Sequence, residues 1–334
     1  RIYIENKMTF QTDLLKRLNE ARPNNKEATH KLYVTCIRKI YEKNKKPFED
    51  IELVKDKGIV LAVVSQFATS TMRNYFIACA NVLRMEEPTE EINNTIKFYE
   101  DSVKKYNNKY NKEQESGIIS DKQEEQFSIG IEGVIDMLLK MEHNLENDKT
   151  YLCWLVFQIL MRHPLRNEVV TLKKISYSNF AKLKLEAGPS GDNYLVIPAN
   201  IYKNPLKIVS TNYKTSGTYG IKTINIEDKQ LRKMLMNYIK HTGNVKDGEA
   251  LFRLDEKDVD EKTLTNLLLY HTKSFTQNGV SISTTIFVKI ILSHKFQDVS
   301  FEMKKAAIDR GHSISTQGKT YIKQLKPMNL EKTE

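Results

Sequence analysis

The sequence predicts a mainly helical protein with a small β-sheet, divided into two domains. Apolar residues recur at three-and-four spacing along most of the chain, which is typical of helices with one buried face. Alternating, β-branched residues are concentrated between positions 193 and 226, which favours a few short strands there. The chain of 334 residues is longer than one domain of roughly 150 residues. We therefore expect a helical domain followed by an α+β domain.

The first 110 residues are expected to form a domain built of helices alone. Helical spacing of apolar residues is found in 8–22, 27–45, 51–67, 69–85 and 89–107. Pro23 and Pro88 separate segments, since proline lacks the amide hydrogen that a helix interior requires. The following stretch, 111–124, is polar and is expected to be a linker. The solvated end of a long helix is the alternative for the first part of this polar region.

The second domain is expected to span 125–334. The segment 149–161 is apolar enough to be a central core helix. Strands are expected at 193–200, 206–211 and 219–226, and the glycines within 216–220 favour a hairpin turn. The other expected helices are 126–143, 228–241, 261–274, 283–294 and 299–309.

Composition limits the classes of protein that the chain can belong to. It has 52 Lys and Arg against 42 Asp and Glu, a formal charge of +10, which suits either a nucleic-acid partner or a solubilising surface. No apolar run is long enough to span a membrane, and the start of the chain lacks the apolar segment of a signal peptide. It also lacks an initiator Met, so we expect a fragment or a processed product.

The three cysteines, Cys36, Cys79 and Cys153, are far apart and form no CxxC pair. This spacing favours buried thiols of an intracellular protein over zinc ligands or a disulfide framework. No group of His, Cys and Asp residues has the spacing of metal ligands, so neither a metal nor another cofactor is expected.

Four stretches in the second half carry residues suited to phosphate chemistry. They are HPLRNEVVTL (163–172), NYKTSGTYGIKTINI (212–226), STTIFVKIILSH (283–294) and RGHSISTQGKTYIKQ (310–324). The last one places Tyr321 nine residues after His312 (321 − 312 = 9). A phosphodiester under attack gains negative charge on its non-bridging oxygens, which cationic side chains stabilise.

In this order, the four stretches resemble the tyrosine recombinase/integrase family. Gly311, His312 and Ser313, with Tyr321, match the family's Gly-His-Ser box and its nucleophilic tyrosine. The family's arginine box is matched by Leu165, Arg166, Glu168 and Leu172. The hairpin is similar to the family's lysine-bearing hairpin, which gives that role to Lys214, with Lys222 as its competitor.

The resemblance implies a role for each of these residues. Tyr321 attacks a DNA phosphodiester and forms a 3′-phosphotyrosyl link, while Lys214 protonates the leaving 5′-oxygen. His312 binds the phosphate and helps to deprotonate Tyr321, and Arg166 and Lys289 bind the phosphate oxygens. Glu168 orients a catalytic side chain. The phosphotyrosyl link conserves bond energy, so strand rejoining needs neither ATP nor metal.

Two departures from the family pattern affect these roles. Glu168 comes two residues after Arg166, where the family has its acidic residue three after. The second arginine of a His-x-x-Arg pattern is missing. Counting back 23 residues from His312 gives Lys289, with Ile286 in place of the histidine. Lysine supplies charge without the two-pronged contact of arginine. A slip of one residue would place Val288 there and leave the role empty.

The resemblance also implies partners. The expected partner is double-stranded DNA, held between the helical core-binding domain and the catalytic domain, with a homo-tetramer on paired DNA sites and no membrane. Candidate DNA contacts are Arg73, Asn74, Lys39 and Lys222. The expected location is intracellular, with DNA, in a bacterial or viral-host cytoplasm or a nucleus. The Lys-, Asn- and Ile-rich composition suggests a virus or mobile element.

Two alternatives remain open from the sequence. A type IB topoisomerase uses a similar Arg, Lys, His and Tyr set to relax supercoils. A catalytically inactive relative would bind DNA without cleaving it, and the missing second arginine favours this alternative.

Overall fold

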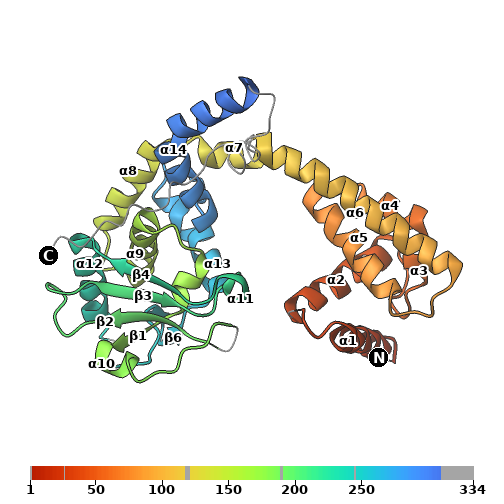
Figure 1. The fold of residues 1–334 in the computed structure, drawn as a ribbon, viewed down its shortest axis with the longest axis horizontal. Coiled ribbons are helices and arrows are strands. Elements are labelled where there is room, and N and C mark those ends of the chain that lie inside the picture. Colours follow the sequence, from red (N-terminus) through yellow and green to blue (C-terminus); the bar gives the residue numbers. More distant parts are fainter. Residues whose placement is uncertain (1, 26, 117–120, 189–190, 244–245, 310–334) are drawn as a thin grey trace. The chain divides into compact units, whose positions relative to one another are not determined.

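The computed structural model of the chain describes residues 2–25, 27–116, 121–188, 191–243 and 246–309. The chain divides into two compact units, Arg1–Ile118 (unit 1) and Ile119–Glu334 (unit 2). Each unit has its own hydrophobic core. Both are drawn in Figure 1.

Among its described residues, unit 1 consists of helices and their connections and contains no strand. Its elements are α1 (Ile2–Ala21), α2 (Glu27–Lys43), α3 (Glu52–Lys55), α4 (Lys57–Val64), α5 (Thr69–Leu83) and α6 (Glu90–Ser116). The single helix expected over 51–67 is two helices, because Asp56 has an extended backbone between them. Its carboxylate accepts the amide hydrogens of Gly58 and Ile59 and so caps the start of α4.

The core of unit 1 surrounds α5. Its apolar residues recur at helical spacing, and Phe76 is fully buried. The Phe76 ring stacks on the rings of Tyr99 and Tyr106 of α6, with centroids 5.9 and 5.6 Å apart. The Tyr99 hydroxyl donates to the carbonyl oxygen of Val54 at 2.6 Å, so this buried polar group is satisfied.

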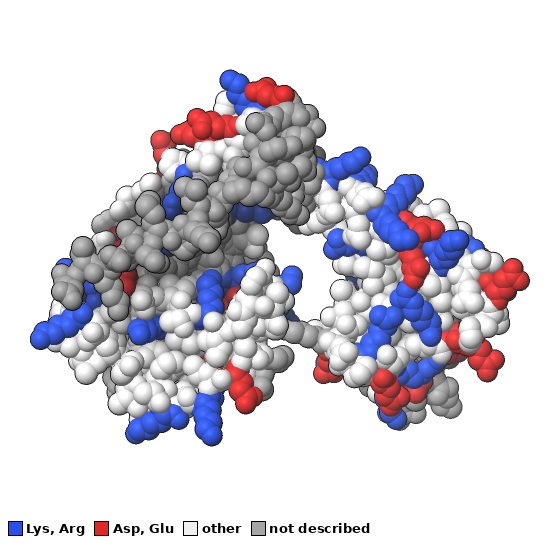
Figure 2. All heavy atoms as spheres, viewed as in Figure 1, with Lys and Arg blue, Asp and Glu red and all other residues white. Residues whose placement is uncertain are grey.

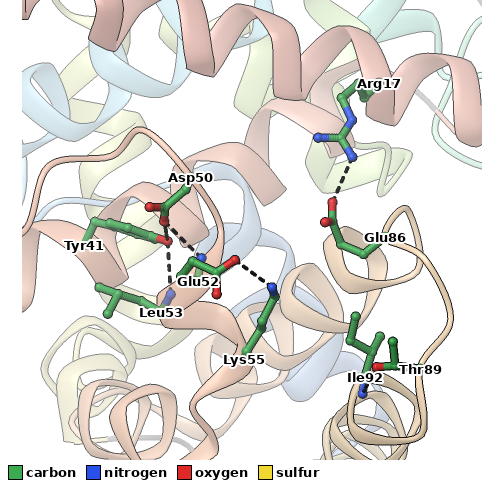
Figure 3. Close-up of polar contacts among 9 residues, drawn as sticks. All are labelled: Arg17, Tyr41, Asp50, Glu52, Leu53, Lys55, Glu86, Thr89 and Ile92. Atoms are coloured by element: carbon green, nitrogen blue, oxygen red, sulfur yellow. Dashed lines mark hydrogen bonds and ion pairs between the residues drawn. The ribbon is translucent and has the colours of Figure 1, made fainter.

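Polar contacts fix the connections between these helices (Figure 3). The Tyr41 hydroxyl donates to Asp50 Oδ1 at 2.6 Å and accepts the Leu53 amide at 3.1 Å, which ties α2 to the start of α3. The Arg17 guanidinium of α1 contacts the Glu86 carboxylate, after α5, at 2.9 Å. Unit 1 is therefore held by specific contacts as well as by apolar burial.

The expected linker at 111–124 is partly helix, because α6 continues to Ser116. Polar Lys, Asn, Gln and Glu side chains are compatible with an exposed helix, and the first residue with strong helix-breaking character is Gly117. An ion pair of 4.0 Å between Lys109 and Glu113, four residues apart, adds local support. The polar composition of residues 111–116 therefore does not mark the end of α6.

Unit 2 combines helices with a small mixed sheet, as expected for the fold class. Its elements up to the last strand of that sheet are α7 (Asp121–Phe127), α8 (Gly130–Glu142), α9 (Asp148–Arg162), η1 (Asn167–Thr171), β1 (Leu172–Ser176), α10 (Tyr177–Phe180), β2 (Asn193–Ile197), β3 (Leu206–Ser210), α11 (Ser216–Tyr219) and β4 (Lys222–Ile226). The following elements are α12 (Lys229–His241), β5 (Arg253–Leu254), β6 (Lys257–Asp258), α13 (Glu261–His271), η2 (Thr272–Ser274) and α14 (Thr284–Asp309). The two helices expected at 283–294 and 299–309 correspond to the two parts of α14, which meet at a kink where Phe296 has a non-helical backbone.

The four-stranded sheet has the order β1-β2-β3-β4. β1 and β2 are parallel, with Leu172 opposite Asn193, and the other neighbours are antiparallel, with Ser210 opposite Lys222. This topology brings the starts of β1, β2 and β4 and the finish of β3 to one end of the sheet. We call it the η1 end, because η1 leads directly into β1 there.

The core of unit 2 lies between one face of this sheet and the helices. All side chains of α9 from Thr150 to Leu160 are buried. The α9 residue Phe157 stacks on Phe287 of α14, with ring centroids 4.4 Å apart. The sheet contributes five core residues: Leu172, Leu195, Leu206, Ile208 and Ile226. No helix in the described part of the chain is both long enough and apolar enough to cross a membrane.

Candidate functional site

Three of the predicted cationic residues belong to the η1 end of the sheet. Arg166 directly precedes η1, and Lys214 follows the finish of β3 by four residues. Lys222 is the first residue of β4, opposite Ser210. All three side chains are exposed. The sheet thus gathers residues that are up to 56 positions apart in sequence (222 − 166 = 56).

The Arg166 backbone is held by its neighbour Asn167. The Asn167 side-chain amide donates to Thr265 Oγ1 of α13 at 3.1 Å, and its carbonyl oxygen accepts the Thr284 hydroxyl at the start of α14. Arg166 itself makes no side-chain hydrogen bond or ion pair with the described residues. Its guanidinium is thus presented on an anchored segment with its donors available to an anion.

The Glu168 carboxyl lies within electrostatic reach of both Arg166 and Lys222. Burial raises the pKa of Glu168, and the nearby Glu261 carboxylate raises it further. The positive charges of Arg166 and Lys222 oppose this shift in pKa. The structure therefore brings Glu168, Arg166 and Lys222 into one charged group, whose carboxyl is half-buried and whose cations are exposed.

His163, three residues before Arg166, is a neighbour that sequence reasoning did not single out. Burial is the main cause that lowers its pKa, and the charges of Arg162 and Lys222 lower it further, against the opposing effect of Asp228. The Asp228 carboxylate accepts the Arg162 Nε hydrogen at 2.6 Å, which ties α9 to the start of α12. The available signal was that His163 is the first residue of the stretch 163–172, which also contains Arg166.

The Lys214 loop connects β3 to β4 and contains one helical turn, α11, in place of a plain hairpin turn. The Tyr213 hydroxyl donates to the carbonyl oxygen of Gly220 at 2.9 Å and closes the loop. Gly220 has a φ of 69°, which glycine adopts without strain. Lys214 is exposed and makes no side-chain hydrogen bond or ion pair within the described ranges.

Lys289 lies on α14 and faces another helix. Its ammonium group donates to Gln123 Oε1 of α7 at 3.5 Å. Five residues separate it from Thr284, the α14 residue bonded to Asn167, which corresponds to about 140° around a helix. Val288 is only about 40° from Thr284 by the same geometry. The described contacts of Lys289 are thus with α7, and its phosphate-binding role stays a prediction.

His312 and Tyr321, with Gly311 and Ser313, lie outside the described residues. Their roles also stay predictions. Within the residues that the structure does describe, no three His, Cys, Asp or Glu side chains gather as they would around a metal ion. The three cysteines are free and buried, as expected, and burial raises the pKa of Cys36 to about 11.

The candidate DNA contacts of unit 1 differ in how they are held. Arg73 of α5 donates to Asn107 Oδ1 of α6 at 3.0 Å, and its guanidinium lies 5.2 Å from the centre of the Tyr110 ring. Asn74 is half-buried, whereas Lys39 on α2 is exposed. On the visible face of unit 1, Lys and Arg side chains are interspersed with Asp and Glu (Figure 2).

Comparison of the chain with protein-family models, curated proteins and solved structures finds no match. The site is therefore defined by its own geometry. Arg166 precedes η1, Lys214 lies in the loop after β3 and Lys222 begins β4, so three exposed cations belong to one end of a small sheet. The half-buried Glu168 lies near Arg166 and Lys222. Such an arrangement can bind and polarise a phosphate group.

Proposed function

We propose that the protein is a DNA strand transferase of the tyrosine recombinase type, which cleaves a DNA strand by forming a phosphotyrosyl bond and then breaks that bond to reseal the strand. The observation that carries the proposal is the arrangement of Arg166, Lys214 and Lys222 at the η1 end of one sheet. The nine-residue spacing from His312 to Tyr321 supplies the missing nucleophile and base in the sequence. Phosphoryl chemistry at a DNA backbone needs this combination of groups.

In the proposed reaction, the Tyr321 oxygen attacks the phosphorus atom and loses its proton with help from His312. A bond forms between this oxygen and phosphorus, and the bond from phosphorus to the 5′-oxygen breaks. Lys214 gives a proton to the departing 5′-oxygen, and Arg166 stabilises the charge on the non-bridging oxygens. Attack by a 5′-hydroxyl on the phosphotyrosine reverses these steps and rejoins the strand.

Double-stranded DNA is the proposed partner, inside a cell. The formal charge of +10 supports it, because cations that neutralise phosphates release counterions. Unit 1 is proposed as the core-binding domain and unit 2 as the catalytic domain. We further propose that a homo-tetramer on two DNA sites carries out strand exchange, as recombination of two duplexes needs four cleavages.

A DNA-binding relative that does not cleave is the second candidate, and one observation favours it. The described hydrogen bond of the Lys289 ammonium group is to Gln123 of α7, at 3.5 Å, and not to Arg166 or its neighbours, so nothing described places Lys289 in the role of the missing second arginine. Cleavage by the wild type separates the two candidates, and in a wild type that cleaves, the variant Lys289→Ala tests the role of Lys289. Loss of cleavage in this variant would support Lys289 as a phosphate ligand, whereas an active variant would remove it from the mechanism.

The test uses a nicked duplex that releases a short fragment after cleavage and so traps the covalent protein–DNA link. We expect wild-type protein to form this link in the presence of EDTA, since side-chain cations replace metal in the proposed mechanism. Tyr321→Phe should abolish the covalent link and retain binding, because only one hydroxyl is lost. The control is Tyr202→Phe, which removes the hydroxyl of a tyrosine that is 87% exposed, away from the η1 end.

Each result has a distinct meaning. A covalent link that persists in Tyr321→Phe would overturn the assignment of the nucleophile. Strict dependence of cleavage on Mg²⁺ would indicate a different nuclease chemistry. DNA binding with no covalent link in the wild type would favour the inactive relative. Relaxation of supercoiled DNA without exchange between two sites would favour the topoisomerase.

A further inference from the structure

Asn193 is a buried polar residue at the centre of the η1 end. It is the first residue of β2 and lies opposite Leu172 of β1, and its side chain is only 4% exposed. Its amide side chain satisfies hydrogen-bond partners on two neighbouring segments. One segment leads to Lys214, and the other follows Arg166.

The first set of contacts fixes the backbone that leads into the Lys214 loop. The amide hydrogens of Thr211 and Asn212 both donate to Asn193 Oδ1 at 3.0 Å. Asn193 Nδ2 donates to the carbonyl oxygen of Asn212 at 2.8 Å. Three of the four hydrogen bonds of this side chain therefore hold the two residues directly after β3. Lys214 comes two residues after Asn212.

The second contact reaches the segment after Arg166. Asn193 Nδ2 also donates to Thr171 Oγ1 at 3.0 Å. The Thr171 hydroxyl in turn donates to the carbonyl oxygen of Glu168 at 2.8 Å, across the 3₁₀ helix that begins after Arg166. One side chain thus connects the backbone on which Lys214 is held to the backbone on which Arg166 and Glu168 are held.

We propose that Asn193 is a positioning residue that sets the placement of Lys214 relative to Arg166 in the strand-transfer reaction. This inference rests on the proposed function. Asparagine is suited to the position because its oxygen accepts both amides while its nitrogen donates to two acceptors. Aspartate would place an oxygen against the Asn212 carbonyl, and alanine would leave buried groups without partners. Asn193 touches neither substrate nor a reacting atom in this proposal.

The test compares two nicked DNA substrates that differ in one atom, the bridging 5′-oxygen or a sulfur in its place. An alkoxide leaving group needs a proton from Lys214, whereas a thiolate leaves without one because thiols are far more acidic. A small misplacement of a catalytic group can cost about a hundredfold in rate, so we expect Asn193→Ala to slow cleavage of the oxygen substrate by about that factor. With the sulfur substrate most of this loss should disappear, as it should for Lys214→Ala.

Two controls separate positioning from simple destabilisation. Ile239→Ala removes buried apolar volume in α12, away from the η1 end, and should lower stability without any dependence on the leaving atom. Thr171→Val disturbs only the branch toward Arg166, so any loss should be equal for both substrates. Because Thr171 is half-buried, this variant also keeps the test usable if Asn193→Ala fails to fold.

The outcomes distinguish the inference from the function on which it rests. A wild type that cleaves both substrates, with an Asn193→Ala loss confined mainly to oxygen, supports the inference. An equal loss on both substrates, or no loss, overturns it and leaves the strand-transfer function standing. If Asn193→Ala does not fold, an equal Thr171→Val loss on both substrates supports the inference, and a Thr171→Val loss that disappears with sulfur overturns it, because the contact toward Arg166 would then act through Lys214. A wild type that cleaves neither substrate overturns both proposals.

Discussion

Arg73 in unit 1 and Arg166 in unit 2 were both predicted to contact DNA, Arg73 as a binding residue and Arg166 as a catalytic one, and their surroundings differ. Arg73 uses its guanidinium within its own unit, with a hydrogen bond to Asn107 and a ring contact with Tyr110. Arg166 is exposed, and the side chain beside it, Asn167, makes the anchoring contacts. An arginine whose donors are used by its own fold contributes to stability, whereas one carried on an anchored backbone is available to a ligand.

The largest effect is expected at the η1 end of unit 2, where Lys214 lies in the β3–β4 connection and Lys222 begins β4. Loss of a general acid typically costs about 10²–10⁴ in rate, so Lys214→Ala should slow cleavage by that order. Lys222→Ala should have a smaller effect, since its charge acts on Glu168 and His163. The measurement is the single-turnover cleavage rate on a nicked duplex. The reverse ranking would transfer the general-acid role to Lys222.

Replacement of Arg166 should lower the cleavage rate, whereas replacement of Arg73 should lower the stability. Arg166→Ala should lower cleavage by about 10²–10³, the usual cost of removing one preorganised donor, with little change in stability. Arg166→Lys should restore only part of the rate, because lysine lacks the planar fork. Arg73→Ala should cost about 1 kcal/mol of unfolding free energy and leave the chemical step unchanged. Equal stability losses in the two alanine variants, measured by urea denaturation, would contradict the comparison.

Salt dependence distinguishes Lys39 from Arg73 as DNA contacts in unit 1. If exposed Lys39 neutralises a phosphate, Lys39→Ala should reduce the slope of log K against log salt by about 0.9. Arg73→Ala should leave this slope nearly unchanged, because its guanidinium is already used by Asn107 and Tyr110. Binding of a fixed duplex across a salt series provides the measurement. A slope reduced by Arg73→Ala alone would reverse the assignment.

The smallest expected effect concerns Glu168. Its pKa is raised above the ordinary value of 4.5, so the folded state holds the proton more tightly than the unfolded state does. Stability of the wild type should therefore fall as pH rises from 4.5 through the raised pKa. The amide side chain introduced by Glu168→Gln does not titrate. The stability of this variant relative to the wild type should therefore increase across this pH range and stay constant above it.

Denaturation curves on both sides of the window check this expectation. Glu146→Gln is the control, because Glu146 is exposed in the connection between α8 and α9. If Glu168→Gln is less stable than the wild type at neutral pH, the prediction is wrong. The attraction of the Glu168 carboxylate to Arg166 and Lys222 would then stabilise the fold by more than the burial of this charge destabilises it.

Periodicity predicted most of the longer helices and three of the four strands of the main sheet, but it missed the short helices α10 and α11 and the strand β1. Its sequence, LKKIS, hides the alternation because Lys174 is buried, and this burial lowers the pKa of Lys174 to about 8. A lysine in that environment breaks the usual rule that lysines are exposed. The strand exists because β2 pairs with it, which no local window contains.

The cationic residues of the candidate site could be chosen from the sequence, but the residues that hold their backbone in place could not. Arg166, Lys214 and Lys222 could be chosen from sequence because their motifs are local. Asn167 and Asn193 could not, since their contacts depend on which strands and helices become neighbours. The hydrogen bond from Arg73 to Asn107, 34 residues later, could not be predicted from the sequence for the same reason.

The contacts of the η1 end also differ in how much chain each must close during folding. Asn193 joins Thr171 and Asn212 across only 22 and 19 residues, whereas the Thr284–Asn167 contact closes 117 residues. Closing a longer loop costs more chain entropy, and long-range contacts form slowly. The sheet end should therefore form as an early local unit, and its docking to the start of α14 should come late. The segment that follows Arg166 would then acquire its final anchor only in the last stage of folding.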